Sequence, residues 1–296
     1  TSLRGAEMSL SSSLSHPFSP AAVCSVLLFA ALISSSADGA LAPNGTSWIE
    51  SSGLRLDVDL SKGAAAHVTH KASGLSSKLV HELRQYEDTA GDSYRMIQHS
   101  PSRDLFNASG WLAAPVVERG PLYQQVVSYN YCNEGDDCPR GLHTRVRVQR
   151  ACPDVIDWIH EWSSVPLDTQ LSIRLTTDLR TGGAFHTDES GFEMRRFEHN
   201  ASKPIAGNYR SIVQTASIED EDAALAVLSE STWGLASLGT GQLELLIQRR
   251  LSNRTHDDAG NPLTHMGPFP LDDDLTALPY SAITSMHGSG GNAPLR

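Results

Sequence analysis

Short stretches in which apolar and polar residues strictly alternate constrain the fold of this chain more than any other feature. Leu54–Leu60 reads Leu-Arg-Leu-Asp-Val-Asp-Leu, and Thr144–Gln149 and Leu171–Leu175 repeat the pattern. A period of two places alternate side chains on opposite faces of a half-buried β-strand. Further runs that suit strands are Tyr123–Tyr131, Ala224–Leu228 and Leu243–Ile247. The chain is therefore expected to be rich in short strands.

Turn-forming residues separate these stretches. Ser73-Gly74, Gly120-Pro121 and Gly182-Gly183 are examples, and each is typical of a tight connection. Helical periodicity is scarce, and only Ser76–Tyr86 offers a mild helical pattern. Many short strands with turns between them predict an all-β fold, an antiparallel β-sandwich.

The composition is that of an ordinary globular protein with an acidic surface. Hydrophobic residues make up 40% of the chain, charged residues make up 19%, and the formal net charge is -11. An acidic surface repels phosphate backbones, so nucleic acid is not expected as a partner.

The N-terminal region contains an apolar run, Ala21–Ile33, followed by small residues. The run is shorter than the ~20 residues that a membrane-spanning helix needs. It resembles the core of a secretory signal peptide, with cleavage after Ala37 or Ala40. A signal anchor or a mistranslated segment are the alternatives. We expect no membrane span beyond this leader.

Cysteines and glycosylation motifs point to the same compartment. Of four cysteines, Cys24 lies in the leader, while Cys132 and Cys138 flank a polar loop that favours a structural disulfide over a redox site. Cys152 is left over, and an alternative pairing with it stays open. Four Asn-x-Ser/Thr motifs are present, at Asn44, Asn107, Asn200 and Asn253. Together these features favour the secretory pathway.

Several segments after Thr181 resemble, in order and spacing, segments of the class II α-mannosidases, glycoside hydrolase family 38. They are Phe185–Arg196, Pro204–Tyr209, Leu225–Leu238 and Gly241–Leu251, followed by Asp257-Asp258. Fainter similarity extends the resemblance from Trp48 to about Asp274.

The resemblance implies a fold, a substrate and a location. In this family the C-terminal region forms a galactose-mutarotase-like supersandwich, packed against a catalytic α/β domain. The implied work is on mannose-containing glycans, in the lysosome, the vacuole or outside the cell. We expect a leader over residues 1–40, the mannosidase C-terminal β-sandwich region over 41–280 and a disordered tail over 281–296.

The catalytic groups of the family have no counterpart in this sequence. Family members cleave with retention, using two carboxylates about 5–5.5 Å apart and a Zn²⁺ held by Asp and His, all supplied by an N-terminal domain. His186-Thr-Asp188 and His256-Asp-Asp258 resemble its His-x-Asp zinc motif, but both lie among the matched strand segments. We expect no cofactor in this chain, with zinc held by the missing catalytic domain. Whether the chain itself is an enzyme stays open.

One polar cluster is a candidate substrate-binding site. By resemblance, Arg249, Arg250, Asp257 and Asp258 line the wall of the sugar pocket; the alternative is a salt-bridge network that joins domains. In the family the Asp pair belongs to a DDxRG element. The expected arginine after Asp258 is absent here, which removes a bidentate contact.

Other candidate residues have simpler explanations. Asp188 and Glu189 are adjacent, so on a strand they point to opposite faces and cannot flank one bond. His67 and His70 offer only two ligands for a metal. The four remaining candidates are tryptophans, expected in the core rather than stacked on sugars: Trp111, Trp158, Trp162 and Trp233.

The sequence thus predicts the C-terminal domain of an α-mannosidase, which supports hydrolysis of α-mannosidic bonds as part of a larger enzyme. A stand-alone glycan-binding β-sandwich and an inactive paralogue are the alternatives. The expected partners are a mannose-containing glycan and a catalytic α-mannosidase domain or chain.

Overall fold

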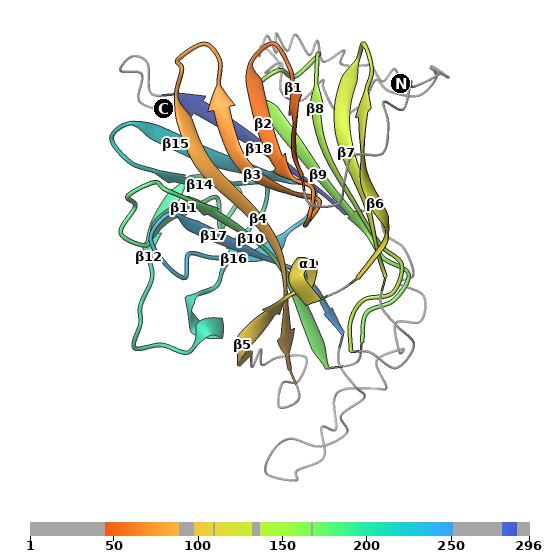
Figure 1. Ribbon diagram of the computed structural model, residues 1–296. Coiled ribbons are helices and arrows are strands. Elements are labelled where there is room, and N and C mark those ends of the chain that lie inside the picture. The colour runs from red at the N-terminus through yellow and green to blue at the C-terminus, as the bar shows by residue number, and fades with distance from the viewer. Residues whose placement is uncertain are drawn as a thin grey trace, which may run out of the picture. The chain divides into compact units, whose positions relative to one another are not determined.

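Two antiparallel sheets of nine strands each account for most of the part of the chain that the structure describes (Figure 1). The computed structural model describes residues 45–88, 98–108, 110–131, 137–166, 168–250 and 280–288. Helical structure among these residues is limited to α1 (Leu105–Ala108) and a 3-10 turn, η2 (Ile205–Asn208). The predicted all-β, antiparallel sandwich is confirmed.

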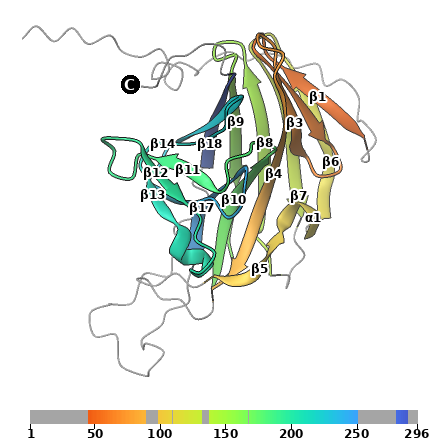
Figure 2. The same cartoon turned by 90° about the vertical axis from the view of Figure 1, so that its left-hand side faces the viewer.

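The first sheet joins the beginning of the described chain to its later part. In order across the sheet, its strands are β1 (Thr46–Glu50), β2 (Leu54–Asp59), β3 (Ala64–His70), β4 (Ser76–Glu87), β10 (Thr169–Thr177), β17 (Gln242–Arg250), β16 (Trp233–Ala236) and β13 (Arg210–Ile212), with β5 (His99–Asp104) paired to β4. Figure 2 shows the long strand β4 leading from the β1–β3 end of this sheet to β5. Strand β4 therefore pairs with β3, β5 and β10 and connects the two halves of the first sheet.

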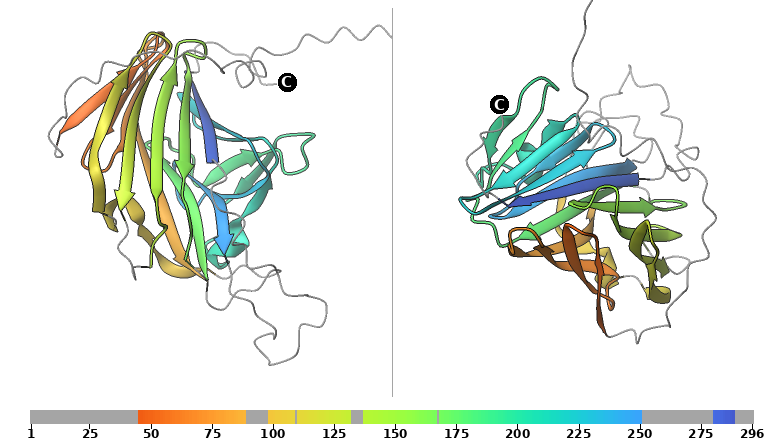
Figure 3. Two further views of the ribbon diagram at one scale, coloured as in Figure 1. Left: turned by 90° about the vertical axis from the view of Figure 1, so that its right-hand side faces the viewer. Right: turned by 90° about the horizontal axis from the view of Figure 1, so that it is seen from above.

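The second sheet is built around β18. In order, its strands are β12 (Arg195–Glu198), β11 (Ala184–Thr187), β14 (Thr215–Glu219), β15 (Ala223–Ser229), β18 (Tyr280–Gly288), β9 (Val155–Glu161), β8 (Leu142–Gln149), β7 (Tyr123–Tyr131) and β6 (Gly110–Arg119). In the view from above, β18 lies between β15 and the green strands β8 and β9 (Figure 3). The sequence placed most of β18 in a disordered tail; its pairing on both sides makes it an interior strand.

The mild helical pattern of Ser76–Tyr86 predicted a helix, and this prediction is wrong. The segment is strand β4. Its burial alternates residue by residue: Leu79, His81 and Leu83 are buried, and the two residues between them, Val80 and Glu82, are more exposed. Leu79 and Leu83 are four residues apart, a spacing that also fits one face of a helix. Pairing with β3 on one side and β10 on the other satisfies the backbone as a ladder instead.

Inward-facing side chains from both sheets form one continuous core. Leu56 from β2, Ile173 from β10, Leu245 from β17 and Val146 from β8 are all essentially inaccessible to solvent. Burying each such side chain contributes roughly 1.5–3 kcal/mol. Three of the four candidate tryptophans are confirmed as buried residues, Trp158, Trp162 and Trp233. The side chain of Trp111 in β6 lies outside the described part.

Two histidines meet in this core, one from each sheet. His81 of β4 and His160 of β9 are fully buried, and their Nε2 atoms lie 3.1 Å apart in a hydrogen bond. Thr144 lies 3.1 Å from the other ring nitrogen of His160, and Trp158 stacks on His81 with ring centroids 5.3 Å apart. Burial lowers the pKa of His160 to about 3. Burial, and then His160, lower the pKa of His81 well below its usual value.

The histidine pair predicts loss of stability in acid. Unfolded histidines gain a proton near pH 6.5, whereas the folded pair stays neutral down to about pH 3 for His160. The contribution is therefore complete above pH 6.5 and is lost as the pH falls toward 3. At pH 5, each histidine that stays neutral in the folded protein lowers the free energy of unfolding by about 2 kcal/mol relative to its value above pH 6.5. Urea unfolding at pH 7.5 and pH 5 measures this loss.

The variant His160→Gln removes one of the two buried titrating groups. We expect the difference in unfolding free energy between the two pH values to shrink by about 2 kcal/mol. His199→Gln changes a half-buried histidine outside the core and serves as the control. An unchanged pH dependence in His160→Gln would show that the pair does not set it.

Candidate functional site

The outward face of the first sheet carries a set of polar side chains that the strand register brings together. Tyr86 of β4, Gln170 of β10 and Arg249 of β17 lie on one rung, and Arg174 lies opposite Glu244. We call the following residues the outer polar cluster: Tyr86, Asp88, Gln170, Arg174, Tyr209, Glu244 and Arg249. Several are fully buried although they face away from the core.

Glu244 is the centre of one half of the outer polar cluster. Its carboxylate has no exposed surface and lies 2.6 Å from the guanidinium of Arg174. The hydroxyls of Tyr86 and Tyr209 both donate to Oε1 of Glu244, at 2.7 and 2.6 Å. Burial, and then the Glu244 carboxylate, raise the pKa of Tyr86 to about 12. The same causes raise the pKa of Tyr209 well above its usual value, so both tyrosines stay protonated hydrogen-bond donors.

Asp88 is the centre of the other half. It follows β4 directly, has no exposed surface, and its Oδ2 lies 2.6 Å from Nε of Arg249 and 2.6 Å from the side-chain amide of Gln170. The Arg249 side chain is 19% exposed. A buried carboxylate is tolerated only when it is paired and hydrogen-bonded. Here Arg249 is the charge partner, and both Arg249 and Gln170 donate hydrogen bonds.

The chemistry of the outer polar cluster is structural rather than nucleophilic. Both carboxylates already accept bonds from an arginine, and both tyrosines are held protonated. Neither carboxylate is therefore free to attack a sugar carbon. Gln170 Oε1 and Ser172 Oγ, on the same face of β10, are buried and have no hydrogen-bond partner among the described residues. This face therefore retains acceptors that a water or a partner group can use.

The predicted sugar-wall residues divide between the two sides of β17. Arg249 points to Asp88, and the next residue, Arg250, donates from Nη1 to the backbone carbonyl of Val165. Adjacent residues of a strand point to opposite faces. Asp257 and Asp258 lie outside the described residues. The structure thus places Arg249 in an ion pair within the domain, and a substrate-binding role for the four residues stays a prediction.

A hairpin between β11 and β12 presents the most exposed aromatic side chain of the described residues. Phe192 is 95% exposed, and Met194 beside it is 45% exposed. The loop that carries them is held at its base by Asp188, whose carboxylate accepts the backbone N–H groups of Val213, Gln214 and Thr215 at 2.9–3.2 Å. Asp188 is therefore a clamp for this loop, and its carboxylate is fully engaged.

The remaining candidates occupy ordinary structural positions. His67 and His70 lie on β3, not on a helix, and their odd spacing points them to opposite faces of the strand. The Nδ1 atom of His70 bonds the hydroxyl of Ser73 at 2.8 Å. Within the described ranges, no group of three or more His, Cys, Asp or Glu side chains could hold a metal ion. No helix in those ranges is long and apolar enough to cross a membrane.

Disulfide and glycosylation predictions fall only partly within the described residues. Cys138 and Cys152 are both disulfide-bonded. Strand β8 separates them, and its eight residues span about 27 Å, so they are not bonded to each other. Cys132 lies outside the described part, and its pairing with Cys138 stays a prediction. Among the sequons, Asn200 is exposed after β12 and Asn107 lies in α1, while Asn44 and Asn253 are not described.

Comparison with known proteins places this geometry in a family. The model of the glycosyl hydrolases family 38 C-terminal domain matches residues 49–260. The chain belongs to glycosyl hydrolase family 38. The match covers most of both sheets and includes the outer polar cluster and the β11–β12 hairpin. The predicted family, and the C-terminal region within it, are confirmed.

Relatives in family 38 are much longer than this chain. The epididymis-specific alpha-mannosidase of Sus scrofa is 34% identical over 176 residues, which are 54% of this chain and 18% of the relative. The lysosomal alpha-mannosidase of Homo sapiens is 35% identical over 121 residues, 36% of this chain and 12% of the relative. The chain thus spans less than a fifth of these relatives.

A solved family 38 structure shares the fold. The structure of an alpha-mannosidase from Enterococcus faecalis V583 superposes with a TM-score of 0.61 over 83% of this chain and 29% of that one, at 12% identity. At this identity the likeness concerns the fold alone. The two-sheet arrangement is therefore a family 38 arrangement.

Sequence reasoning missed most of the outer polar cluster. Asp88 and Glu244 are separated by more than half the chain and meet their arginines only through the β4–β10–β17 pairing. A signal was present, because polar residues recur at every second position of Glu82–Asp88. Such a pattern indicates a solvated face, and its burial could not be read from it.

The ion pair between Arg249 and Asp88 predicts a large loss of stability when the cation is removed. Arg249→Met leaves a fully buried carboxylate without its charge partner, and we expect a loss of about 3 kcal/mol in unfolding free energy. Urea denaturation at pH 7 measures it. The control Arg180→Met removes an arginine whose side chain is 78% exposed and paired to Asp222; it should change stability by less than about 0.5 kcal/mol. Equal effects of both variants would contradict the structural role of the pair.

Proposed function

We propose that this chain is the accessory β-sandwich of an α-mannosidase and supports hydrolysis of α-mannosidic bonds by completing a catalytic domain that carries the zinc and the nucleophile. The observation that carries the proposal is the exposure of Phe192 on a hairpin that Asp188 holds in place. Membership of family 38 supports the choice of reaction, since relatives of this chain are named alpha-mannosidases.

The exposure of Phe192 is unfavourable for the domain alone. Leaving a phenylalanine in water forgoes roughly 1.5–3 kcal/mol that burial would supply. Single exposed apolar residues are common, but Phe192 is accompanied by Met194 on the same loop. A partner surface or the face of a sugar ring would cover both, and either occupant fits a domain that forms one side of a glycan-binding site.

The rigidity of the loop supports the same conclusion. Besides the Asp188 clamp, the Thr187 hydroxyl donates to the carbonyl of Ser211 at 2.8 Å, and the Ser211 hydroxyl donates to the carbonyl of Glu189 at 3.1 Å. A contact residue held by such bonds loses little conformational freedom on binding. The hairpin is therefore built to present Phe192 rather than to adapt around a ligand.

The secretory pathway is the compartment that fits this function. The named relatives include lysosomal and epididymis-specific alpha-mannosidases. Asn200 is exposed, and its side-chain oxygen accepts bonds from both the backbone and the hydroxyl of Ser202. We propose this sequon as a glycosylation site, and a Cys132–Cys138 disulfide, with the lysosome, the vacuole or the extracellular space as the destination.

Complementation tests the proposed function. The epididymis-specific α-mannosidase of Sus scrofa, truncated before its own matching region, is co-secreted with this chain, and release from a chromogenic α-mannoside is measured. We expect activity to rise above that of the truncated enzyme alone. Phe192→Ser should reduce the gain at least tenfold because a buried aromatic contact is worth more than about 1.4 kcal/mol.

The matched control is Val116→Ser, which removes an exposed apolar residue, 38% accessible, from β6 at the far edge of the second sheet. It should leave the gain in activity unchanged. If the chain is secreted and folded but gives no gain, or if both variants lose the gain equally, then the hairpin is not the surface that completes the enzyme.

A further inference from the structure

Three turns from both sheets meet at one end of the sandwich. They are the β1–β2 turn at residues 51–53, the β6–β7 turn at Gly120–Leu122 and the β8–β9 turn at residues 150–154. The backbone N–H of Glu50 donates to the side chain of Gln124 at 3.0 Å, and the N–H of Arg150 donates to the carbonyl of Leu122 at 2.8 Å. These contacts fix the turns relative to one another.

The β1–β2 turn depends on a glycine at its closest approach to the β8–β9 turn. A Cβ on Gly53 would lie 2.0 Å from a carboxylate oxygen of Asp154 and 2.8 Å from the backbone oxygen of Pro153. The hydroxyl of Ser51 donates to that same oxygen of Pro153. The backbones of the two turns are therefore in close contact. A preformed hollow lies beside them.

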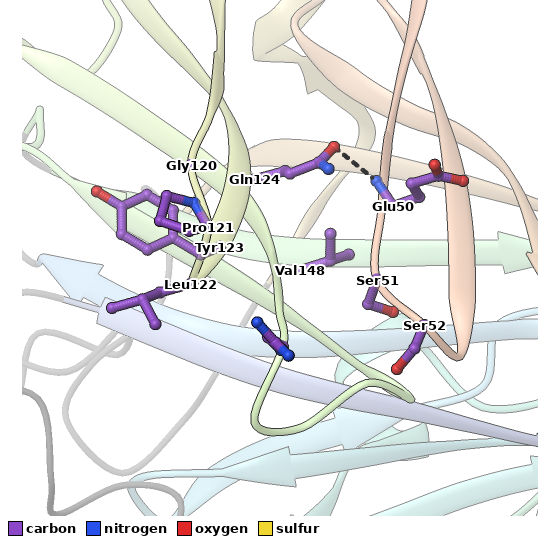
Figure 4. A pocket seen from close by; sticks show the side chains of 10 residues that line it. Glu50, Ser51, Ser52, Gly120, Pro121, Leu122, Tyr123, Gln124 and Val148 are labelled. Atoms are coloured by element: carbon purple, nitrogen blue, oxygen red, sulfur yellow. Dashed lines mark hydrogen bonds between the residues drawn. The ribbon is translucent and has the colours of Figure 1, made fainter. Parts of the chain in front are cut away.

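The hollow is a pocket of about 270 Å³, just below the ~300 Å³ at which small-molecule sites usually begin. It therefore accommodates one ring rather than a chain. In Figure 4, residues 120–123 lie on one side and Glu50, Ser51 and Ser52 on the other, with Val148 between them. Arg150 also lines the pocket.

The pocket offers unused donors and acceptors beside an apolar surface. Arg150 and Ser52 are exposed, and the guanidinium and the hydroxyl have no hydrogen-bond partner among the described residues. Leu122, which is 42% exposed, contributes apolar surface next to these polar groups.

This combination selects the chemistry of the ligand. A pyranose ring carries hydroxyls that both donate and accept, and an apolar face of C–H groups. An inorganic anion would use Arg150 but not the apolar surface of Leu122, so a sugar ring uses more of the pocket. We propose that this pocket binds a single pyranose unit of a glycan.

The pocket is separate from the surfaces that serve the proposed function. Arg249 is on the rung at the last residues of β4, whereas the β1–β2 turn is at the end where β4 begins, and a strand of this length spans about 40 Å. Phe192 follows β11 at one edge of the second sheet, and the β6–β7 turn lies at its other edge. The proposal therefore does not rest on the mannosidase assignment and adds an accessory glycan site to it.

Ligand-observed NMR with the full chain tests the proposal. The probes are methyl α-mannoside, methyl α-glucoside, methyl N-acetyl-β-glucosaminide and sulfate. We expect at least one sugar to bind with a dissociation constant of roughly millimolar strength. Arg150→Met and Ser52→Ala should each weaken that binding, the first about tenfold or more because it removes charge-assisted hydrogen bonds. Both residues lie in turns, so matching thermal melts identify folded variants.

One control separates this site from the rest of the molecule. Arg196→Met removes an arginine whose side chain is 58% exposed, on β12, and it should bind the sugars as the unaltered chain does. Binding that Arg150→Met keeps, or that Arg196→Met loses to the same extent, would lie outside the pocket and overturn the proposal. The absence of binding by any sugar, or binding of sulfate alone, would overturn it as well.

Discussion

The pairing of β4 with β10, and of β10 with β17, is the constraint on which the rest of the structure depends. One face of this three-strand ladder places Leu83, Ile173 and Leu245 on a single rung in the core. The opposite face places Tyr86, Gln170 and Arg249 on another. Because side chains alternate, a slip of one residue would exchange the two faces and bury the polar set in the core. One strand register therefore determines both the core and the outer polar cluster.

The same ladder explains why the outer face does not resemble a catalytic site although it is rich in carboxylates. Asp88 and Glu244 each have an arginine and further donors within hydrogen-bond distance. They stabilise three strands from distant parts of the chain. The two surfaces proposed for recognition lie elsewhere, on the clamped β11–β12 hairpin and in the pocket between three turns. This arrangement fits the proposed role in positioning and binding.

The sequence predicted the strands well where alternation was strict, as in Leu54–Leu60, and it predicted the family from motifs that the structure shows to be mostly structural. Asp188, for example, clamps a loop. It failed for β4, where an i, i+4 leucine pair fits both periods and only the neighbouring strands decide between them. The sequence also placed most of β18 in a tail, because a Gly-rich C-terminal segment does not reveal that this strand pairs with β9 and β15. Burial of the outer polar cluster depends on contacts between distant segments, which a local pattern cannot contain.

The central proposal is that this chain supports mannoside hydrolysis by a catalytic domain and does not perform it alone. The most direct test is to secrete the chain, purify it, and measure release from a chromogenic α-mannoside with added Zn²⁺ at acid and neutral pH, against a mock purification. The account predicts no release above the mock at either pH, from a protein that is folded by its thermal melt. Zinc-dependent turnover by the purified chain would contradict the account, because it would require a nucleophile and a metal site within this sequence.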